Sequence, residues 1–180
     1  RTQATDAVNA MAEQFGMLPN RIMPSFTALT SKFKGLGMTT EEAMAQATTA
    51  TNIAADAAAF YDKSMEESQS ALNSFVNGSY EAGESIGLFA NETQLAGWAA
   101  QNLGVDWNTL DEAGKQVARL EFAKAMQEAA GATGQASRES DSYENQLGNM
   151  KQAWSDFAAL VGAPSLAIAV QGLQTVTGWL

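Results

Sequence analysis

Cysteine and histidine are both absent from this chain of 180 residues. Without cysteine the chain can form no disulfide and offers no thiolate ligand to a metal ion. Without histidine it lacks the commonest general base and every Ser-His or Cys-His catalytic pair. These two absences exclude the commonest kinds of nucleophilic catalysis and transition-metal binding before any motif is considered.

Basic residues are also scarce. The chain has 10 lysines and arginines against 20 aspartates and glutamates, which gives a formal net charge of -10. The imbalance is concentrated in residues 38–112, where twelve acidic residues are accompanied by Lys63 alone. A field of this sign opposes binding to nucleic acid and to anionic membranes, so we expect no direct nucleic-acid binding.

The alternating pattern of β-strands is almost missing, whereas apolar residues recur at helical spacing along most of the chain. The sequence therefore predicts an all-α fold, specifically a multi-helix bundle with a Gly/Ser-rich connector before a long C-terminal helix. We expect a helical core domain over residues 1–130 and a flexible connector over residues 131–142. An amphipathic helix followed by an uncharged apolar segment is expected over residues 143–180.

Three predicted helix starts fit the capping box, in which a hydroxyl and a carboxylate three residues later each accept a hydrogen bond from an otherwise unpaired backbone N–H. The three predicted pairs are Thr39 with Glu42, Ser64 with Glu67, and Thr109 with Glu112. Alanine and threonine fill most of the helix that begins after Thr39, which indicates close approach between helices.

One apolar stripe in the C-terminal helix has the spacing of two heptads, with successive intervals of 3, 4, 3 and 4 residues. Its members are Leu147, Met150, Trp154, Phe157 and Val161. Such a stripe predicts that this helix packs against a partner helix or mediates self-association.

The order of these motifs resembles the core region of bacteriophage tail tape measure proteins. The helix start "GMTTEEA" at 37–43 is followed by "ADAAAF" at 55–60, "SMEE" at 64–67, the turn "GESIGLF" at 83–89 and "LAGWA" at 95–99. The similarity continues through "LDEAGKQVAR" and through "NQLGNMKQAWSDFAALVG". It covers roughly residues 20–165, and its specificity lies in the order of the motifs.

The resemblance implies a long, mostly helical structural protein in the lumen of a phage tail, made in the host cytoplasm. Its implied roles are tail length determination, tail tube assembly and genome ejection. The implied partners are the tail tube protein, the tail assembly chaperones and the tail tip or baseplate proteins. We therefore expect this chain to be a segment of a longer protein, with a structural role and with no enzymatic activity, cofactor or metal.

Two alternatives come from the residues themselves. Ser31 and Lys34 have the spacing of a Ser–Lys nucleophile pair, and the glutamate pairs at 41–42 and 66–67 would suit glycoside hydrolysis. No partner motif accompanies the Ser–Lys pair. The glutamates fall in first helical turns, where capping and the helix dipole explain them better.

The second alternative is a membrane-active or pore-forming helical segment that acts at the host envelope during DNA delivery. Residues 157–180 carry no acidic or basic side chain and have the length of a membrane span. Pro164, Gln171 and Gln174 weaken this interpretation. Packing against a partner is favoured, with contact to the host membrane through 157–180 kept as the alternative.

Overall fold

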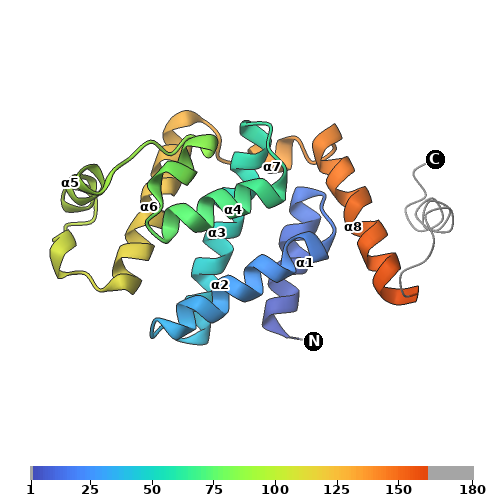
Figure 1. The fold of residues 1–180 in the computed structure, drawn as a ribbon, viewed down its shortest axis with the longest axis horizontal. Helices are drawn as coiled ribbons and strands as arrows, with labels where there is room; N and C mark the ends of the chain where they lie inside the picture. Colours follow the sequence, from blue (N-terminus) through green and yellow to red (C-terminus); the bar gives the residue numbers. More distant parts are fainter. Residues whose placement is uncertain (1, 162–180) are drawn as a thin grey trace.

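The computed structural model describes residues 2–161, and within this range every regular element is a helix. Figure 1 shows an elongated arrangement, with α5 and α6 toward one end and α8 at the other. The elements in chain order are α1 (Gln3–Phe15), η1 (Pro19–Arg21), α2 (Met23–Gly35), α3 (Thr40–Phe60), α4 (Met65–Val76), η2 (Tyr80–Ile86), α5 (Glu92–Asn102), η3 (Trp107–Thr109), α6 (Glu112–Ala130), α7 (Gln135–Arg138) and α8 (Tyr143–Val161). The predicted all-α class is confirmed for this part of the chain.

Helix α3 is the centre of the fold, because it contacts α1, α2, α4, α6 and α7. Its inward residues are mostly alanines, and Ala43, Ala47 and Ala50 are at most 2% exposed. Small side chains on the central helix let the surrounding helices approach closely, as its composition indicates.

The surrounding helices supply the bulk of the core. Four phenylalanines from three of them are almost fully buried: Phe15, Phe26, Phe33 and Phe75. The ring of Phe75 stacks on that of Phe122, with ring centroids 6.1 Å apart, and Trp98 meets Phe122 edge-on at 5.5 Å. Large aromatic side chains on the outer helices therefore fill the space that the alanines of α3 leave.

Two of the predicted helix caps are present. Thr39 and Glu42 form the complete capping box of α3, with N–H to oxygen distances of 3.1 and 2.9 Å. Ser64 caps α4 by accepting from the Glu67 N–H at 3.1 Å, but the Glu67 carboxylate accepts from the Ser64 hydroxyl instead of the backbone. The predicted box at α4 is thus only half formed.

The predicted cap of α6 by Thr109 and Glu112 is wrong. Asp111 is the capping residue, and its carboxylate accepts from the Gly114 N–H at 2.8 Å. Thr109 belongs to the preceding short turn η3, where its hydroxyl donates to the Asp106 carbonyl. Because η3 continues to Thr109, the helix begins two residues later than the spacing predicts.

Residues 131–142 also differ from the predicted flexible connector. They contain the short helix α7, and Ala132 and Ala136 are buried. The Asp56 carboxylate of α3 accepts hydrogen bonds from the N–H groups of Gly134 and Ala136, at 2.9 and 3.0 Å. A carboxylate from a distant helix thus holds this glycine-rich segment against the bundle.

Helix α8 lies where the long C-terminal helix is predicted, and it ends with the described part of the chain. The uncharged segment expected after it, residues 162–180, lies outside the described residues, and so does the side chain of Val161. Among the described residues, no helix is long and apolar enough to cross a membrane.

Candidate functional site

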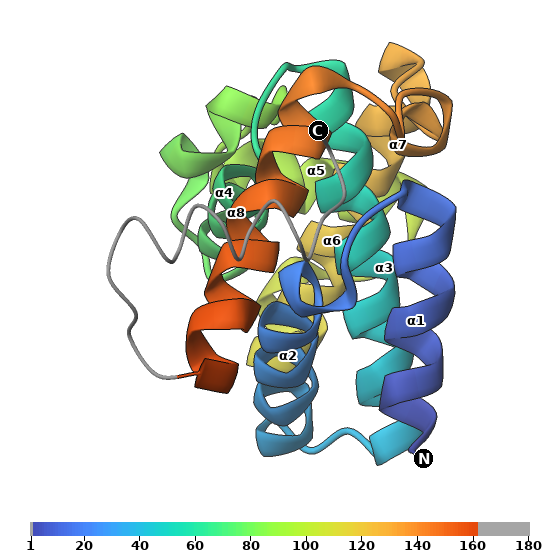
Figure 2. The same ribbon diagram turned by 90° about the vertical axis from the view of Figure 1, so that its right-hand side faces the viewer.

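Helix α8 rests on the body of the fold through a set of polar side chains, and Figure 2 shows it crossing in front of α4. We call this set the polar joint and define it as Arg21, Glu66, Asn145 and Asn149. Its members come from η1, from the first turn of α4 and from the first half of α8. The joint is the feature that fixes where α8 lies.

The guanidinium of Arg21 is the centre of the polar joint, and its side chain is 1% exposed. It donates to the Asn145 side-chain oxygen at 2.7 Å, to the Asn145 carbonyl at 2.9 Å and to the Asn149 side-chain oxygen at 3.0 Å. Its Nε–H donates to the Glu66 carboxylate at 3.1 Å. A buried charge needs this many partners, because leaving one unpaired away from water is costly.

The two asparagines of the joint also bind the end of α1. Helix α1 ends at Phe15 and is followed by Gly16, whose left-handed φ of +64° turns the chain. The Asn145 amide donates to the carbonyls of Phe15 and Gly16, at 3.0 and 3.1 Å, and the Asn149 amide donates to Gly16 at 2.9 Å. Both carbonyls belong to the end of a helix, where no intrahelical donor is available.

Gly148 makes the close approach of α8 possible. A Cβ at this position would overlap the guanidinium of Arg21, closer than any real Cβ contact allows. No side chain fits there unless the guanidinium or the helix moves. The absence of a side chain at 148 is therefore required for the joint as it stands.

The carboxylate of Glu66 is ionised more readily than an ordinary glutamate. Burial favours its neutral form, but the hydrogen bond and the charge of Arg21 outweigh burial and lower the pKa of Glu66 below its usual value. Lys151 of α8 acts in the same direction. Glu144 of α8 shares a small surface pocket with Glu66, so α8 presents one charge of each sign to this carboxylate.

The predicted apolar stripe does not make the joint. Leu147, Met150, Trp154 and Phe157 are half-buried, and the apolar core cluster of the described residues includes none of them. The rings of Trp154 and Phe157 lie beside each other, with centroids 6.2 Å apart. The role of this stripe in binding a partner helix therefore stays a prediction.

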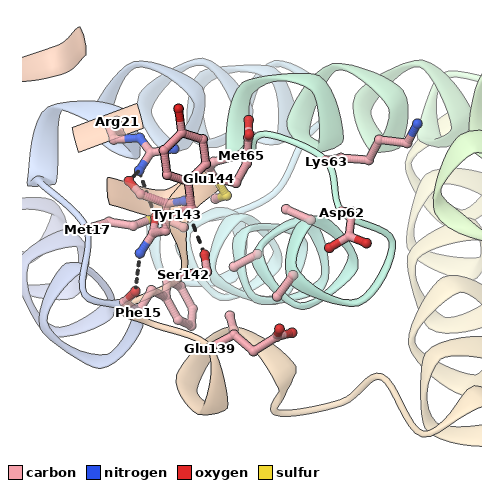
Figure 3. Close-up of a pocket in the computed structure, with 15 residues that line it drawn as sticks. Phe15, Met17, Arg21, Asp62, Lys63, Met65, Glu139, Ser142, Tyr143 and Glu144 are labelled. Carbon is pink, nitrogen blue, oxygen red and sulfur yellow. Dashed lines mark hydrogen bonds between the residues drawn. The ribbon is translucent and has the colours of Figure 1, made fainter. Parts of the chain in front are cut away.

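A cavity of about 300 Å³ adjoins the polar joint. Figure 3 shows its apolar side chains, Phe15, Met17 and Met65, together with Asp62 and Glu139, while Lys63 extends away from it. Asp62 has a left-handed φ of +55°, which aspartate tolerates better than most residues. Tyr143 also lines the cavity and is 79% exposed.

A second buried arginine, Arg119 of α6, organises the opposite end of the bundle. It donates to the Val76 carbonyl at 2.9 Å, to Glu112 at 3.1 Å and to the Tyr80 hydroxyl at 3.2 Å. Its guanidinium also faces the rings of Tyr80 and Trp107, 5.7 and 5.5 Å from their centroids. Glu112, predicted as part of a cap, is therefore an ion-pair partner.

Hydrogen bonds and nearby charges set the ionisation of this second cluster. The hydrogen bond from Gln116 is the largest of the effects that lower the pKa of Glu112, and the charge of Arg119 adds to it. Burial lowers the pKa of Lys32, and Arg119 lowers it further, while Glu112 acts in the opposite direction. Repulsion between Lys32 and Arg119 is thus partly offset by the shared Glu112.

Sequence reasoning located the caps of α3 and α4 but missed the polar joint. Arg21 carries no motif, and Asn145 and Asn149 lie within a stretch that was quoted for its family resemblance and not for polar contacts. One signal was available, because asparagines four residues apart share one face of a helix. Within residues 2–161, no group of acidic side chains is arranged to hold a metal ion.

Comparison with protein-family models, curated proteins and solved structures finds no match for this chain.

Proposed function

We propose that this chain is a structural segment of a bacteriophage tail tape measure protein, which works by packing helices against one another and against neighbouring subunits. Its proposed roles are tail length determination, tail tube assembly and genome ejection, within the lumen of the tail. The proposed partners are the tail tube protein, the assembly chaperones and the tip or baseplate proteins. The motif order of the sequence and its all-helical described part support this proposal.

The observation that carries the proposal is the apolar stripe of α8. Four large apolar side chains recur at heptad spacing on a helix that is seated by polar contacts and stands outside the apolar core cluster. A stripe that the domain does not use for its own core is suited to contact with another helix. We therefore infer that α8 contributes an assembly surface.

The charge distribution supports the absence of direct nucleic-acid binding in this proposal. Residues 38–112 carry a strong negative charge, and most of that charge lies on helices exposed at the surface. Repulsion would keep DNA from adhering to the protein during ejection. Gel retardation of DNA by the chain at physiological salt tests this point, and tight binding would contradict it.

The tail role is tested in the phage that encodes the chain. Met150→Gln together with Trp154→Gln replaces the centre of the stripe with polar groups and leaves the joint untouched. Ser155→Gln is the matched control, because residue 155 is exposed on the same helix. We expect electron microscopy to show tails that are missing or of irregular length for the stripe variant and normal tails for the control. Normal tails in both would contradict the assembly role of the stripe.

A further inference from the structure

The attachment of α8 to the rest of the molecule is unlike that of the other long helices. Only Asn145 and Ala153 of its described side chains are buried, and neither belongs to the apolar core cluster. By contrast, α3 contributes alanines from almost every turn to that cluster. Hydrogen bonds to Arg21, to the end of α1 and between Asn20 and Asp156 hold α8 in place.

Both surfaces of the joint would be well hydrated if they separated. The body contributes the Arg21 guanidinium, the Glu66 carboxylate and the carbonyls of Phe15 and Gly16, and α8 contributes amide side chains. Water can replace each of these partners, so the net cost of exchanging a hydrogen bond is small. Interfaces that open in solution are polar in this way, whereas permanent ones resemble an apolar core.

We propose that α8 is a reversibly docked arm, which leaves and rejoins the body about residues 139–142 while the helices from α1 to α7 stay folded. Opening of this kind is a local event with its own free energy, well below that of global unfolding. It exposes more of the apolar stripe of α8, whose side chains are half-buried in the docked position. The inference concerns the isolated chain and does not depend on the tail role.

The absence of native cysteine allows a direct test by thiol labelling. Ala153→Cys places a thiol on the docked face of α8, and Ala50→Cys places one in the core on α3; these alanines are 5% and 2% exposed. We expect the thiol at 153 to react at least about a hundredfold faster, with a weak dependence on urea, because only a local opening is needed. Equal rates with the same urea dependence would overturn the proposal.

A glycine variant tests whether the joint controls the opening. Gly148→Ala brings a Cβ against the Arg21 guanidinium and should raise the labelling rate at 153 about tenfold or more, leaving the rate at 50 unchanged. Gly97→Ala is the matched control, because a Cβ at this helical position meets no atom within 4 Å. Both variants favour helix formation, so only the clash distinguishes them. An unchanged rate at 153 in Gly148→Ala would overturn the assigned control by the joint.

Amide hydrogen exchange tests the opening of α8 in the unmodified chain, without any substitution. Amides of α8 should exchange well ahead of those of α3, as a group, at neutral pH. If α8 and α3 exchange together, the arm opens only when the whole molecule unfolds, and the proposal fails. Hydrogen exchange tests only whether α8 undocks. The tail role is tested separately, by the variant with Met150→Gln and Trp154→Gln.

Discussion

Replacing Arg119 with methionine should destabilise the whole bundle. Methionine has a similar length and fits an apolar site, so the change removes mainly the charge and its hydrogen bonds. The side chain is 5% exposed and joins α6 to the end of α4 and to η2. Its loss leaves the Val76 carbonyl unpaired in the interior.

The size of the effect follows from these contacts. Removing one partner of a buried ion pair costs about 3–5 kcal/mol. Here Glu112 is 51% exposed and can regain water, which places the expected loss near the lower end, about 3 kcal/mol. For a chain of this size that loss lowers the Tm by about 6–12 °C.

Urea unfolding followed by circular dichroism measures the change in free energy of unfolding. Arg138→Met is the control, because Arg138 is exposed and bonds only within residues 131–138. The control should change the free energy by less than about 0.5 kcal/mol. A loss below about 1 kcal/mol for Arg119→Met would refute the view that this guanidinium is a central support.

Three further outcomes are expected. Thr39→Ala should lower the free energy of unfolding, measured with urea, by about 1 kcal/mol, because it removes the cap of α3. Thr109→Ala should lower it by less than about 0.5 kcal/mol, and equal losses for the two variants would contradict the corrected start of α6. Asp56→Ala should speed hydrogen exchange at the amides of residues 134 and 136 and cost about 2 kcal/mol; unchanged protection there would show that the carboxylate is dispensable. Because the pKa of Glu66 is lowered by folding, its contribution is present above about pH 4.3 and lost as the pH falls through the lower folded value. Glu66→Gln should therefore reduce the loss of free energy of unfolding as the pH is lowered, measured by urea unfolding between about pH 7 and about pH 3, and an identical pH profile would exclude this carboxylate as the cause.

Local chemistry explains why much of the helical framework could be predicted. The box formed by Thr39 and Glu42 involves residues three apart, and helical periodicity lies within a few turns. The alanine-rich composition of residues 40–60 likewise indicated a closely packed helix, and that helix is the centre of the fold. Such features depend on neighbours in sequence, so the sequence alone is enough to read them.

Competing local patterns and distant partners explain the errors. Thr109 and Glu112 have the spacing of a capping box, but a short turn that begins at Trp107 places the start of α6 at Asp111. Residues 131–142 have the composition of a free connector, but Asp56, almost eighty residues away, binds their backbone. Composition indicates the conformation that a segment prefers by itself, and it carries no information about contacts with residues far away in the sequence.

The sequence by itself determined that the described part of this chain is helical, that α3 begins after Thr39 and α4 after Ser64, and that α8 carries an apolar stripe. Only the tertiary structure decided how α8 is seated, because Arg21 is more than a hundred residues away from Asn145 and Gly148 and meets them only after the chain has folded. A buried guanidinium has to be satisfied by whatever acceptors lie within about 3 Å. Because Asn145 and Asn149 supply those acceptors for Arg21, the polar side of α8 faces the body of the fold.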